Sequence, residues 1–527
     1  MARTDVGLSR DPDLLEPVVA PARDRAAVVM AASGETLTYQ ALESRSRRLA
    51  RHLYDLGLRR GETIAILCDN RVEFLEIAWA AQRSGLYYTA INWHLHPDEV
   101  AYILADSGAR VLFVSTALRE TLDRLEGRIA VVQSVIVVGA SDASAGYEKL
   151  LASVEDGPID EPSEGCELLY SSGTTGHPKA VKRPLPPVGE LVANHESAAE
   201  LYRTTYGAGP DSVYLSPAPL YHSAPLMSCL TIHRLGGTVV VMERFDAEQM
   251  LATIARYAVT LGQFVPTMFI RALKLPSEIR ERYDLSSLRC VIHASAPCPV
   301  WTKRAMIDWW GPILHEYYGG TEGMGTTRIT AQQWLEHPGS VGRPAGFRIH
   351  ILDDQGVELG AGQQGVVYFE SDRKFEYLND PDKTASITTP QGWRTLGDVG
   401  YLDEDGYLFL TDRATFMIIS GGVNIYPQEI ENVLVAHPRV QDAAVFGVPN
   451  DDMGEEVKAM VQPIAGAVGD AGFADELLSW CGEHLAKYKW PRSFEFVEHL
   501  PRDPSGKLRK HVLRDAYLAS VAGDSKE

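Results

Sequence analysis

The sequence predicts an α/β protein with two parts. One is a large N-terminal domain of parallel-rich sheets with helices plus a β-rich subdomain, and the other is a small mobile α/β C-terminal domain. The chain has 527 residues, which is too long for a single hydrophobic core. Strand and helix patterns alternate along the first 300 residues, as in parallel sheets covered by helices. From about residue 341 short strands and Gly or Asp turns dominate, which indicates a change of architecture.

The alternating part combines amphipathic helices with buried strands. Leu42, Leu49, Leu53 and Leu56 recur at helical spacing, and Gly57 follows them as a stop signal. Strands are expected over 36–39, 63–68, 111–115, 212–217, 238–243 and 289–295, and a second helix over 72–84.

The domain boundaries follow from the later patterns. Strands are expected over 348–353, 365–370, 406–411, 442–448 and 456–463, and helices over 427–436 and 473–486. We place the N-terminal domain over 1–411, with its β-rich subdomain over about 341–411. A hinge over 412–416 and a C-terminal domain over 417–527 complete the chain.

Composition excludes several classes of protein. Lys plus Arg is 50 and Asp plus Glu is 70, so the net charge of -20 argues against nucleic acid and anionic membranes as partners. The six cysteines form no Cys-x-x-Cys pair, which favours free thiols. No signal peptide and no membrane-length apolar run is present. We expect a cytoplasmic protein without a membrane span, with a homodimer as one candidate assembly.

A dense polar string covers residues 170–179, Tyr-Ser-Ser-Gly-Thr-Thr-Gly-His-Pro-Lys. Its hydroxyls, glycine N–H groups and lysine suit a polyphosphate. The candidate residues are Ser171, Ser172, Gly173, Thr174, Thr175, Gly176 and Lys179. The P-loop reading fails because Gly176 and Lys179 are not adjacent. A polar surface loop is the alternative.

This string resembles the phosphate loop of the adenylate-forming superfamily, which contains acyl-CoA synthetases, luciferases and the adenylation domains of peptide synthetases. Four further strings between 170 and 507 are similar to that superfamily's motifs and follow in its order. The residue sequences of several segments resemble those of the bacterial fatty-acid, bile-acid and steroid-side-chain CoA ligases. The resemblance covers nearly the whole chain and implies an AMP-forming acid–thiol ligase.

The resemblance assigns a nucleotide site. Tyr318 would stack on adenine, Thr321 would contact the α-phosphate, and Glu322 would hold Mg²⁺, which prefers oxygen ligands. Asp398 would accept hydrogen bonds from the ribose hydroxyls. The other residues assigned to the nucleotide are Gly319, Ser295, Ala296, Pro297 and Arg413. Taken singly, the first string is also a Gly-rich turn with an exposed acid, and Asp398 is also a turn residue.

The resemblance also implies two steps and a domain rotation. Lys507 would bridge the carboxylate and the α-phosphate during adenylation, although alone it reads as a solvated lysine. Rotation about Thr415 would then replace it with Gly421 and Gly422, whose backbone approaches the pantetheine arm of CoA. His222 resembles the gate between acyl pocket and pantetheine tunnel, with a core histidine as the alternative.

The acid is expected to be hydrophobic, either fatty or bulky and steroid- or terpenoid-like. Residues 220–225 lack the aspartate that amino-acid-activating relatives carry, so an amino acid is not expected. Candidate pocket residues are Met227, Phe264, Val265 and Met268, which could equally be plain core. ATP and CoA are the implied cosubstrates, with Mg²⁺ as cofactor.

Two departures keep alternatives open. Relatives usually carry Gly where this chain has Ala180, and often Lys where it has Ala414. If position 180 needs positive φ or close packing, alanine costs of order 1 kcal/mol or more. The chain could then mainly thioesterify a supplied adenylate. A non-catalytic acyl- or nucleotide-binding protein and a luciferase-type oxygenase are the other readings.

Overall fold

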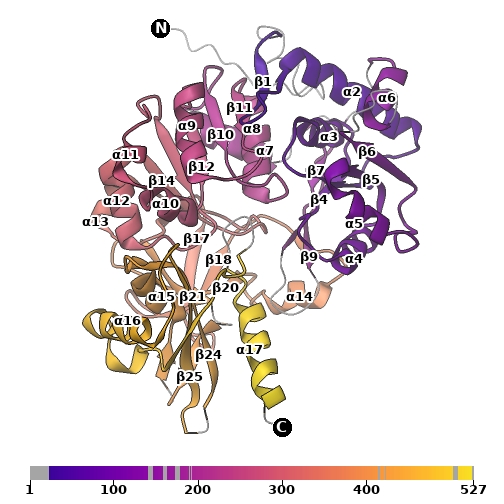
Figure 1. Ribbon diagram of the computed structural model, residues 1–527. Helices are drawn as coiled ribbons and strands as arrows, with labels where there is room; N and C mark the ends of the chain where they lie inside the picture. Colours follow the sequence, from indigo (N-terminus) through magenta and orange to yellow (C-terminus); the bar gives the residue numbers. More distant parts are fainter. Residues whose placement is uncertain are drawn as a thin grey trace.

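The computed structural model describes residues 23–139, 146–157, 159, 163–171, 178–188, 190, 193–413, 416–421, 423–450, 452–502 and 508–524, and every structural statement concerns this part. Five sheets organise it, and helices cover the two largest (Figure 1). The predicted α/β class and the division into a large N-terminal and a small C-terminal α/β part are confirmed.

A nine-stranded sheet forms the centre of the N-terminal part. In spatial order its strands are β16 (Arg343–Pro344), β15 (Thr327–Thr330), β14 (Leu314–Tyr318), β13 (Cys290–His293), β12 (Leu261–Phe264), β10 (Val213–Ser216), β11 (Thr238–Val241), β1 (Ala26–Met30) and β2 (Thr36–Thr38). The strands from β14 to β1 in this order run parallel, and the pairings that involve β2, β15 and β16 are antiparallel.

The two faces of this sheet pack into different cores. Leu261 and Ile292 belong to the core that also holds residues of α2 (Tyr39–Asp55), α3 (Val72–Arg83) and α8 (Ser223–Arg234). Phe264 and Val291 belong to the opposite core, with residues of α9 (Ala247–Tyr257), α10 (Pro266–Leu273) and α12 (Val300–Trp310). This division follows from the alternation of side chains along a strand.

A five-stranded parallel sheet lies beside the first. Its order is β6 (Ser134–Val138), β5 (Ala109–Ser115), β3 (Thr63–Leu67), β4 (Tyr87–Ala90) and β7 (Cys166–Glu167). All five residues of β3 are buried, as expected for a parallel strand with both faces covered. Helix α4 (Pro97–Ser107) begins with a capping box between His96 and Glu99 and ends at Gly108, whose φ is 64°.

Two small antiparallel sheets and the remaining helices complete the N-terminal part. One sheet has the order β19 (Glu376–Tyr377), β9 (Lys179–Lys182), β8 (Leu169–Ser171), and the other β17 (Arg348–Leu352), β18 (Gly365–Glu370), β20 (Arg394–Leu402), β21 (Leu408–Arg413). The remaining helices are α5 (Arg119–Arg124), α6 (Gly146–Ser153), α7 (Ala193–Thr204), α11 (Ser277–Arg280), α13 (Ala331–Glu336) and α14 (Pro381–Ser386).

The C-terminal part has its own sheet and core. The strand order is β23 (Val423–Ile425), β22 (Ile418–Ser420), β25 (Gly454–Pro463), β24 (Val440–Asn450), with β26 (Ser493–Phe496) also paired to β25. Its helices are α15 (Pro427–Ala436), α16 (Ala471–His484) and α17 (Lys510–Asp524). Ile270 of α10 packs into this core, so the two parts are in direct contact.

The predicted elements lie where the patterns placed them, with one difference of detail. Leu42, Leu49 and Leu53 are fully buried along α2, but Leu56 is 39% exposed. Leu56 is the C-cap residue, beyond the last turn that faces the core. None of the helices in the described ranges is long and apolar enough to cross a membrane.

Candidate functional site

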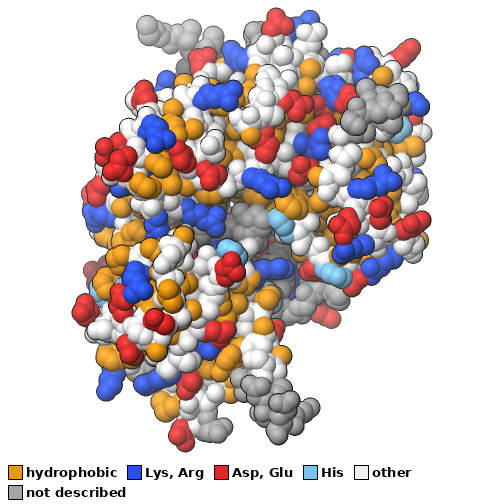
Figure 2. Space-filling model, viewed as in Figure 1, with side chains coloured by type: hydrophobic (Ala, Val, Ile, Leu, Met, Phe, Trp, Pro, Cys, Tyr) orange, Lys and Arg blue, Asp and Glu red, His pale blue; other side chains and the backbone are white. Residues whose placement is uncertain are grey.

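Two groups of predicted nucleotide residues, 295–297 and 318–322, lie where neighbouring parallel strands of the large sheet end. The register places Phe264 of β12 beside His293 of β13, and His293 beside Glu316 of β14. The segments that follow these strands therefore emerge at one edge, which is where open α/β sheets bind ligands. Figure 2 shows a hollow on the face that it draws, between the upper and lower parts of the molecule, with Lys, Arg and His side chains around it.

Tyr318 and Asp398 are brought into contact from different sheets. The Tyr318 hydroxyl donates a hydrogen bond to Oδ2 of Asp398 at 2.6 Å. Tyr318 is the last residue of β14, and Asp398 lies buried on β20. The β20–β21 pairing sets Asp398 directly across from the backbone of Arg413. The structure thus assembles three residues that are separated by up to 95 positions in the sequence, since 413 minus 318 is 95.

The turn after β14 carries the expected phosphate and metal residues. A Cβ at Gly320 would lie 2.4 Å from Oε2 of Glu322, so the glycine leaves room for this carboxylate. The Tyr377 hydroxyl donates to Oε1 of Glu322 at 2.8 Å. A single carboxylate fits Mg²⁺, which keeps several waters and takes its other ligands from substrate phosphates. Glu322 would hold the ion, and the bound ion would neutralise charge on the polyphosphate.

The turn after β13 is held in an uncommon conformation. Ser295 has φ of 76°, one of three non-glycine residues in the described ranges with positive φ. Such strain is uncommon outside glycine and concentrates at functional sites. Ala294 is buried, Ala296 is partly exposed and Pro297 is exposed, so short side chains form this edge beside β14. The role of these residues as the wall of an adenine slot stays a prediction.

Lys179 stands at the start of β9 in an ion pair with Asp380. Asp380 also caps α14 by accepting from the backbone N–H of Lys383 at 2.9 Å. The hydrogen bond from Lys179 is the main cause that holds the pKa of Asp380 below its ordinary value. The lysine is therefore oriented by a partner that the sequence did not reveal.

Several predicted residues cannot be placed. Ser172, Gly173, Thr174, Thr175, Gly176, Ala414, Thr415, Gly422 and Lys507 lie outside the described residues. Ser171 and Arg413 are described only through their backbones, in β8 and β21. The roles expected for all of these residues stay predictions.

Three of the four expected acyl-pocket residues share one core, and the fourth lies on the other face of the sheet. Met227 of α8 packs against one core of the large sheet. Phe264, Val265 and Met268 belong to the core on the opposite face, as does Phe269. His222 is the N-cap residue of α8, and its ring lies 4.5 Å from that of Tyr221. His222 and Met227 therefore belong to the same helix, as its N-cap and as a residue within it. Phe264, Val265 and Met268 pack on the opposite face of the sheet.

Gly421 occupies a turn of the C-terminal part. Its φ is 57°, and its N–H donates to the carbonyl of Met453 at 2.8 Å. A Cβ here would lie 2.5 Å from Cε of Met453. The left-handed backbone favours glycine at this position, whereas the Met453 side chain is exposed and its end could move aside.

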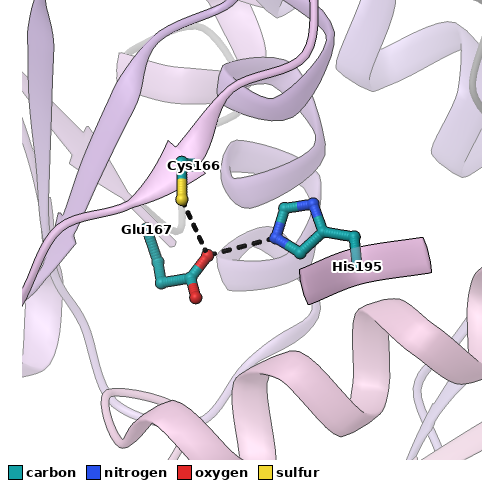
Figure 3. A group of neighbouring side chains, drawn as sticks. All are labelled: Cys166, Glu167 and His195. Carbon is teal, nitrogen blue, oxygen red and sulfur yellow. Dashed lines mark hydrogen bonds and ion pairs between the residues drawn. The ribbon is translucent and has the colours of Figure 1, made fainter. Parts of the chain in front are cut away.

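Sequence reasoning missed a buried ionic network next to this site. Nδ1 of His195, on α7, lies 3.0 Å from Glu164. Its Nε2 lies 3.2 Å from Glu167, and Cys166 approaches the same carboxylate (Figure 3). Arg234 pairs with Glu164, and Arg183 pairs with Glu167. The sequence did carry one signal of this network. Glu164 and Glu167 lie in a segment with the pattern of a buried strand, and a buried charge requires a partner.

The charges of this network show what kind of site it is. Burial opposes ionisation of Glu167, but Arg183 and His195 outweigh it and hold its pKa well below the usual range. Burial would lower the pKa of His195, but the two carboxylates raise it instead. Burial raises the pKa of the Cys166 thiol, which donates toward Glu167 at 3.5 Å. Because cations already face both carboxylates, this group is an ion-pair network rather than a metal site.

Comparisons with known proteins match both parts of the chain. Residues 15–375 match a family model described as AMP-binding enzyme, and residues 429–507 match one described as AMP-binding enzyme C-terminal domain. The chain is 32% identical to the long-chain-fatty-acid–CoA ligase FadD13 of Mycobacterium tuberculosis, over 92% of this chain and 94% of that one.

A second relative and a solved structure extend the comparison. The chain is 35% identical to a feruloyl-CoA synthase of an Amycolatopsis species, over 92% of this chain and 94% of that one. The anthranilate CoA ligase AuaEII, solved in complex with anthranoyl-AMP, superposes with a TM-score of 0.83 at 26% identity, covering 99% of this chain and all of the other. The chain belongs to the AMP-binding enzymes, the adenylate-forming superfamily that its motifs resemble.

Proposed function

We propose that this AMP-forming acid–thiol ligase activates a hydrophobic carboxylic acid with ATP and transfers the acyl group to CoA. The observation that carries the proposal is the Tyr318–Asp398 contact beside the Glu322 turn. It joins the residue expected at adenine to the residue expected at ribose, and Glu322, expected at Mg²⁺, follows Tyr318 in the next turn. The acids named for the relatives are a long-chain fatty acid and ferulate, which are largely apolar.

The first step makes an acyl adenylate. A carboxylate oxygen of the acid attacks the α-phosphorus of ATP, the bond to the β-phosphate oxygen breaks, and pyrophosphate leaves. Asp398 and Tyr318 orient the nucleoside, and Thr321 faces the α-phosphate. Lys507 would lower the repulsion between the carboxylate and the polyphosphate. Mg²⁺ on Glu322 supplies charge neutralisation when bound.

The second step makes the thioester. The CoA thiol releases its proton to solvent, its sulfur attacks the acyl carbon, and AMP leaves with the phosphate oxygen of the anhydride. Rotation of the C-terminal part about Thr415 would exchange Lys507 for the Gly421–Gly422 turn between the steps. The left-handed backbone of Gly421, without a side chain, supports an approach of this turn to the pantetheine arm.

A buried polar chain favours an acid with a hydrogen-bonding group. Ser228 donates to Oε1 of Gln263 at 2.6 Å, and Nε2 of Gln263 donates to the Tyr317 hydroxyl at 2.7 Å. A hydroxyl has one proton, so Tyr202, at 2.6 Å, must donate to Ser228. The Tyr317 proton is then directed away from Gln263.

This polar chain shares a helix and a core with Met227, one of the residues expected in the acyl pocket. Ser228 follows Met227 on α8, and Tyr317 and Met227 pack against the same core of the sheet. Together they offer an apolar wall with one hydroxyl donor. This favours an aromatic acid with an oxygen substituent over a plain aliphatic or steroid acid, because a polar group at the wall needs a partner.

Ala180 supports a complete ligase over an adenylation-impaired one. It lies on β9 opposite Tyr170, is fully buried, and is not among the described residues with positive φ. Its methyl group belongs to a small core with Tyr87 and Leu168. The strain that alanine would impose in a left-handed backbone is therefore absent here.

Mass spectrometry of acyl-CoA formation tests the proposal. Cinnamic, hydroxylated cinnamic, dodecanoic and steroid acids are each offered as free acid with Mg-ATP and CoA, and as synthetic acyl-AMP with CoA. Product by both routes is expected, with the hydroxylated aromatic acid preferred. Tyr317→Phe should remove the preference between the two cinnamic acids. Product from acyl-AMP alone would support the impaired alternative, and product by neither route would overturn the proposal.

A further inference from the structure

Arg183 joins the buried ionic network to the turn that carries Thr321 and Glu322. It follows β9 directly and is 9% exposed. Its Nη1 pairs with Glu167, and its Nη2 donates to the backbone carbonyl of Thr321 at 2.9 Å. One guanidinium group therefore contacts both the strand that leads toward the phosphate loop and the turn expected to hold Mg²⁺.

The network behind Arg183 fixes its position. Glu167 accepts from Arg183 and also faces Nε2 of His195 at 3.2 Å. His195 faces Glu164 through its other nitrogen, and Glu164 pairs with Arg234. Each of these residues is at most 9% exposed. A buried network with every charge paired is rigid, because moving one member leaves a charge unpaired.

A second contact holds the same turn, and it comes from the three-stranded sheet that contains β9. Tyr377 of β19 donates to Glu322 at 2.8 Å, and β19 pairs with β9. Arg183 thus holds the backbone of the turn, and Tyr377 holds the carboxylate next to it. The planar guanidinium supplies two donors in fixed directions, which a lysine ammonium cannot reproduce.

We propose that Arg183, together with Tyr377, is a positioning residue that fixes the Thr321–Glu322 turn for binding of metal-complexed ATP. Arg183 acts through the turn and touches neither nucleotide nor metal in this role. The inference rests on the proposed function only in the roles given to Thr321 and Glu322. Its consequence is confined to the nucleotide step, since the thioester step starts from a bound adenylate.

The chain offers a matched control in Arg234. This arginine is 8% exposed, pairs with Glu164 in the same network, and donates to Gln82 at 3.0 Å. Unlike Arg183, it has no described contact with the 319–323 turn. Arg183→Lys and Arg234→Lys therefore make the same chemical change at similar burial, and only the first loosens the turn.

Calorimetric titration with α,β-methylene-ATP measures nucleotide binding without turnover. At fixed Mg²⁺, Arg183→Lys should bind the analogue at least about tenfold more weakly, because one directed contact to the turn is lost. Arg234→Lys should stay within about twofold of the wild type. Pyrophosphate release should fall in Arg183→Lys, while CoA transfer from synthetic acyl-AMP should change by less than about threefold.

Equal weakening in both lysine variants would mean that the network is only structural and would overturn the proposal, as would normal binding in Arg183→Lys. Melting temperatures are measured for each variant. If Arg183→Lys does not fold, Tyr377→Phe is measured in its place. This change removes the hydrogen bond to Glu322 without changing a charge. Unchanged binding in that variant overturns the proposal. If the wild type binds the analogue but activates no acid, the proposed function is refuted. The comparison of nucleotide binding between Arg183→Lys and Arg234→Lys would still test the role of Arg183.

Discussion

The Tyr318 hydroxyl lies 2.6 Å from Oδ2 of Asp398, and this hydrogen bond joins the nine-stranded sheet to the four-stranded sheet beside it. The acceptor is a buried carboxylate, 7% exposed. Hydrogen bonds to charged groups are worth about 1.5–3 kcal/mol, roughly twice a neutral one. The contact therefore orients the expected ribose carboxylate before any nucleotide binds.

Tyr318→Phe keeps the ring and removes the donor. We expect the KM for ATP to rise about tenfold, since 1.4 kcal/mol corresponds to a factor of ten. The KM for the acid should change little. Initial rates of pyrophosphate release against ATP concentration measure the effect. Tyr317→Phe, the neighbouring control, should alter acid preference and leave ATP unaffected, and the reverse pattern would contradict both assignments.

Ala180→Gly restores the residue common in relatives, yet no gain in adenylation is expected. Ala180 sits in ordinary strand backbone with its methyl group buried. Glycine removes that packing and adds backbone entropy to the unfolded chain, at a cost of about 1 kcal/mol. Urea denaturation should show the loss of stability, and pyrophosphate release should stay within about twofold of the wild type. A large gain in release would revive the impaired alternative.

His195 should make stability depend on pH. Its pKa is raised in the folded protein, against about 6.5 for an ordinary histidine. The folded state then binds the proton more tightly, so the stabilisation is complete below pH 6.5 and is lost as pH rises through the folded pKa. The melting temperature of the wild type should therefore fall toward that of His195→Gln as pH rises above 6.5. A wild-type advantage that grows as pH rises would contradict this protonation.

Lys274 should make the contact between the two parts depend on pH in the opposite direction. It lies just after α10 and donates to the carbonyls of Val440 and Gln441 on β24. Burial lowers its pKa to about 8. The docked arrangement thus binds the proton less tightly than a free lysine with a pKa of about 10.4, and docking should strengthen as pH rises above 8.

Förster transfer between dyes on the two parts measures this docking. The wild type should show increasing transfer between pH 7.5 and 9.5. Lys274→Met keeps the apolar stem of the side chain and removes the titrating group, so its transfer should be constant over the same range. An identical response in both proteins would assign the effect to another group.

Local sequence patterns were sufficient to predict the helices and strands. The all-apolar stretch of β3 and the leucine spacing of α2 each predict one structure, because burial of one face or of both faces leaves a periodic mark in the sequence. The resemblance of short motifs supplied Tyr318, Glu322 and Asp398. It did not supply Arg183 or Tyr377, which lie outside those motifs.

The acyl-pocket prediction shows where sequence reasoning ends. Phe264 and Gln263 are neighbours in the chain, but a strand directs them to opposite faces. Apolar character drew attention to Phe264, which packs in the core with Met268. Gln263 faces α8 and bonds to Ser228 there. Only the sheet decides which of two adjacent side chains packs in which core.

The sequence by itself determined the class of fold, the order of the strands and helices, and the motifs that place the chain among the AMP-binding enzymes. These depend on periodicity and on residue types at short spacing, which act locally. The tertiary structure alone decided that Tyr318 meets Asp398, that Lys179 pairs with Asp380, and that Arg183 reaches Thr321. Such contacts join segments far apart in the chain. Their partners are selected by the packing of whole sheets, which no local pattern records.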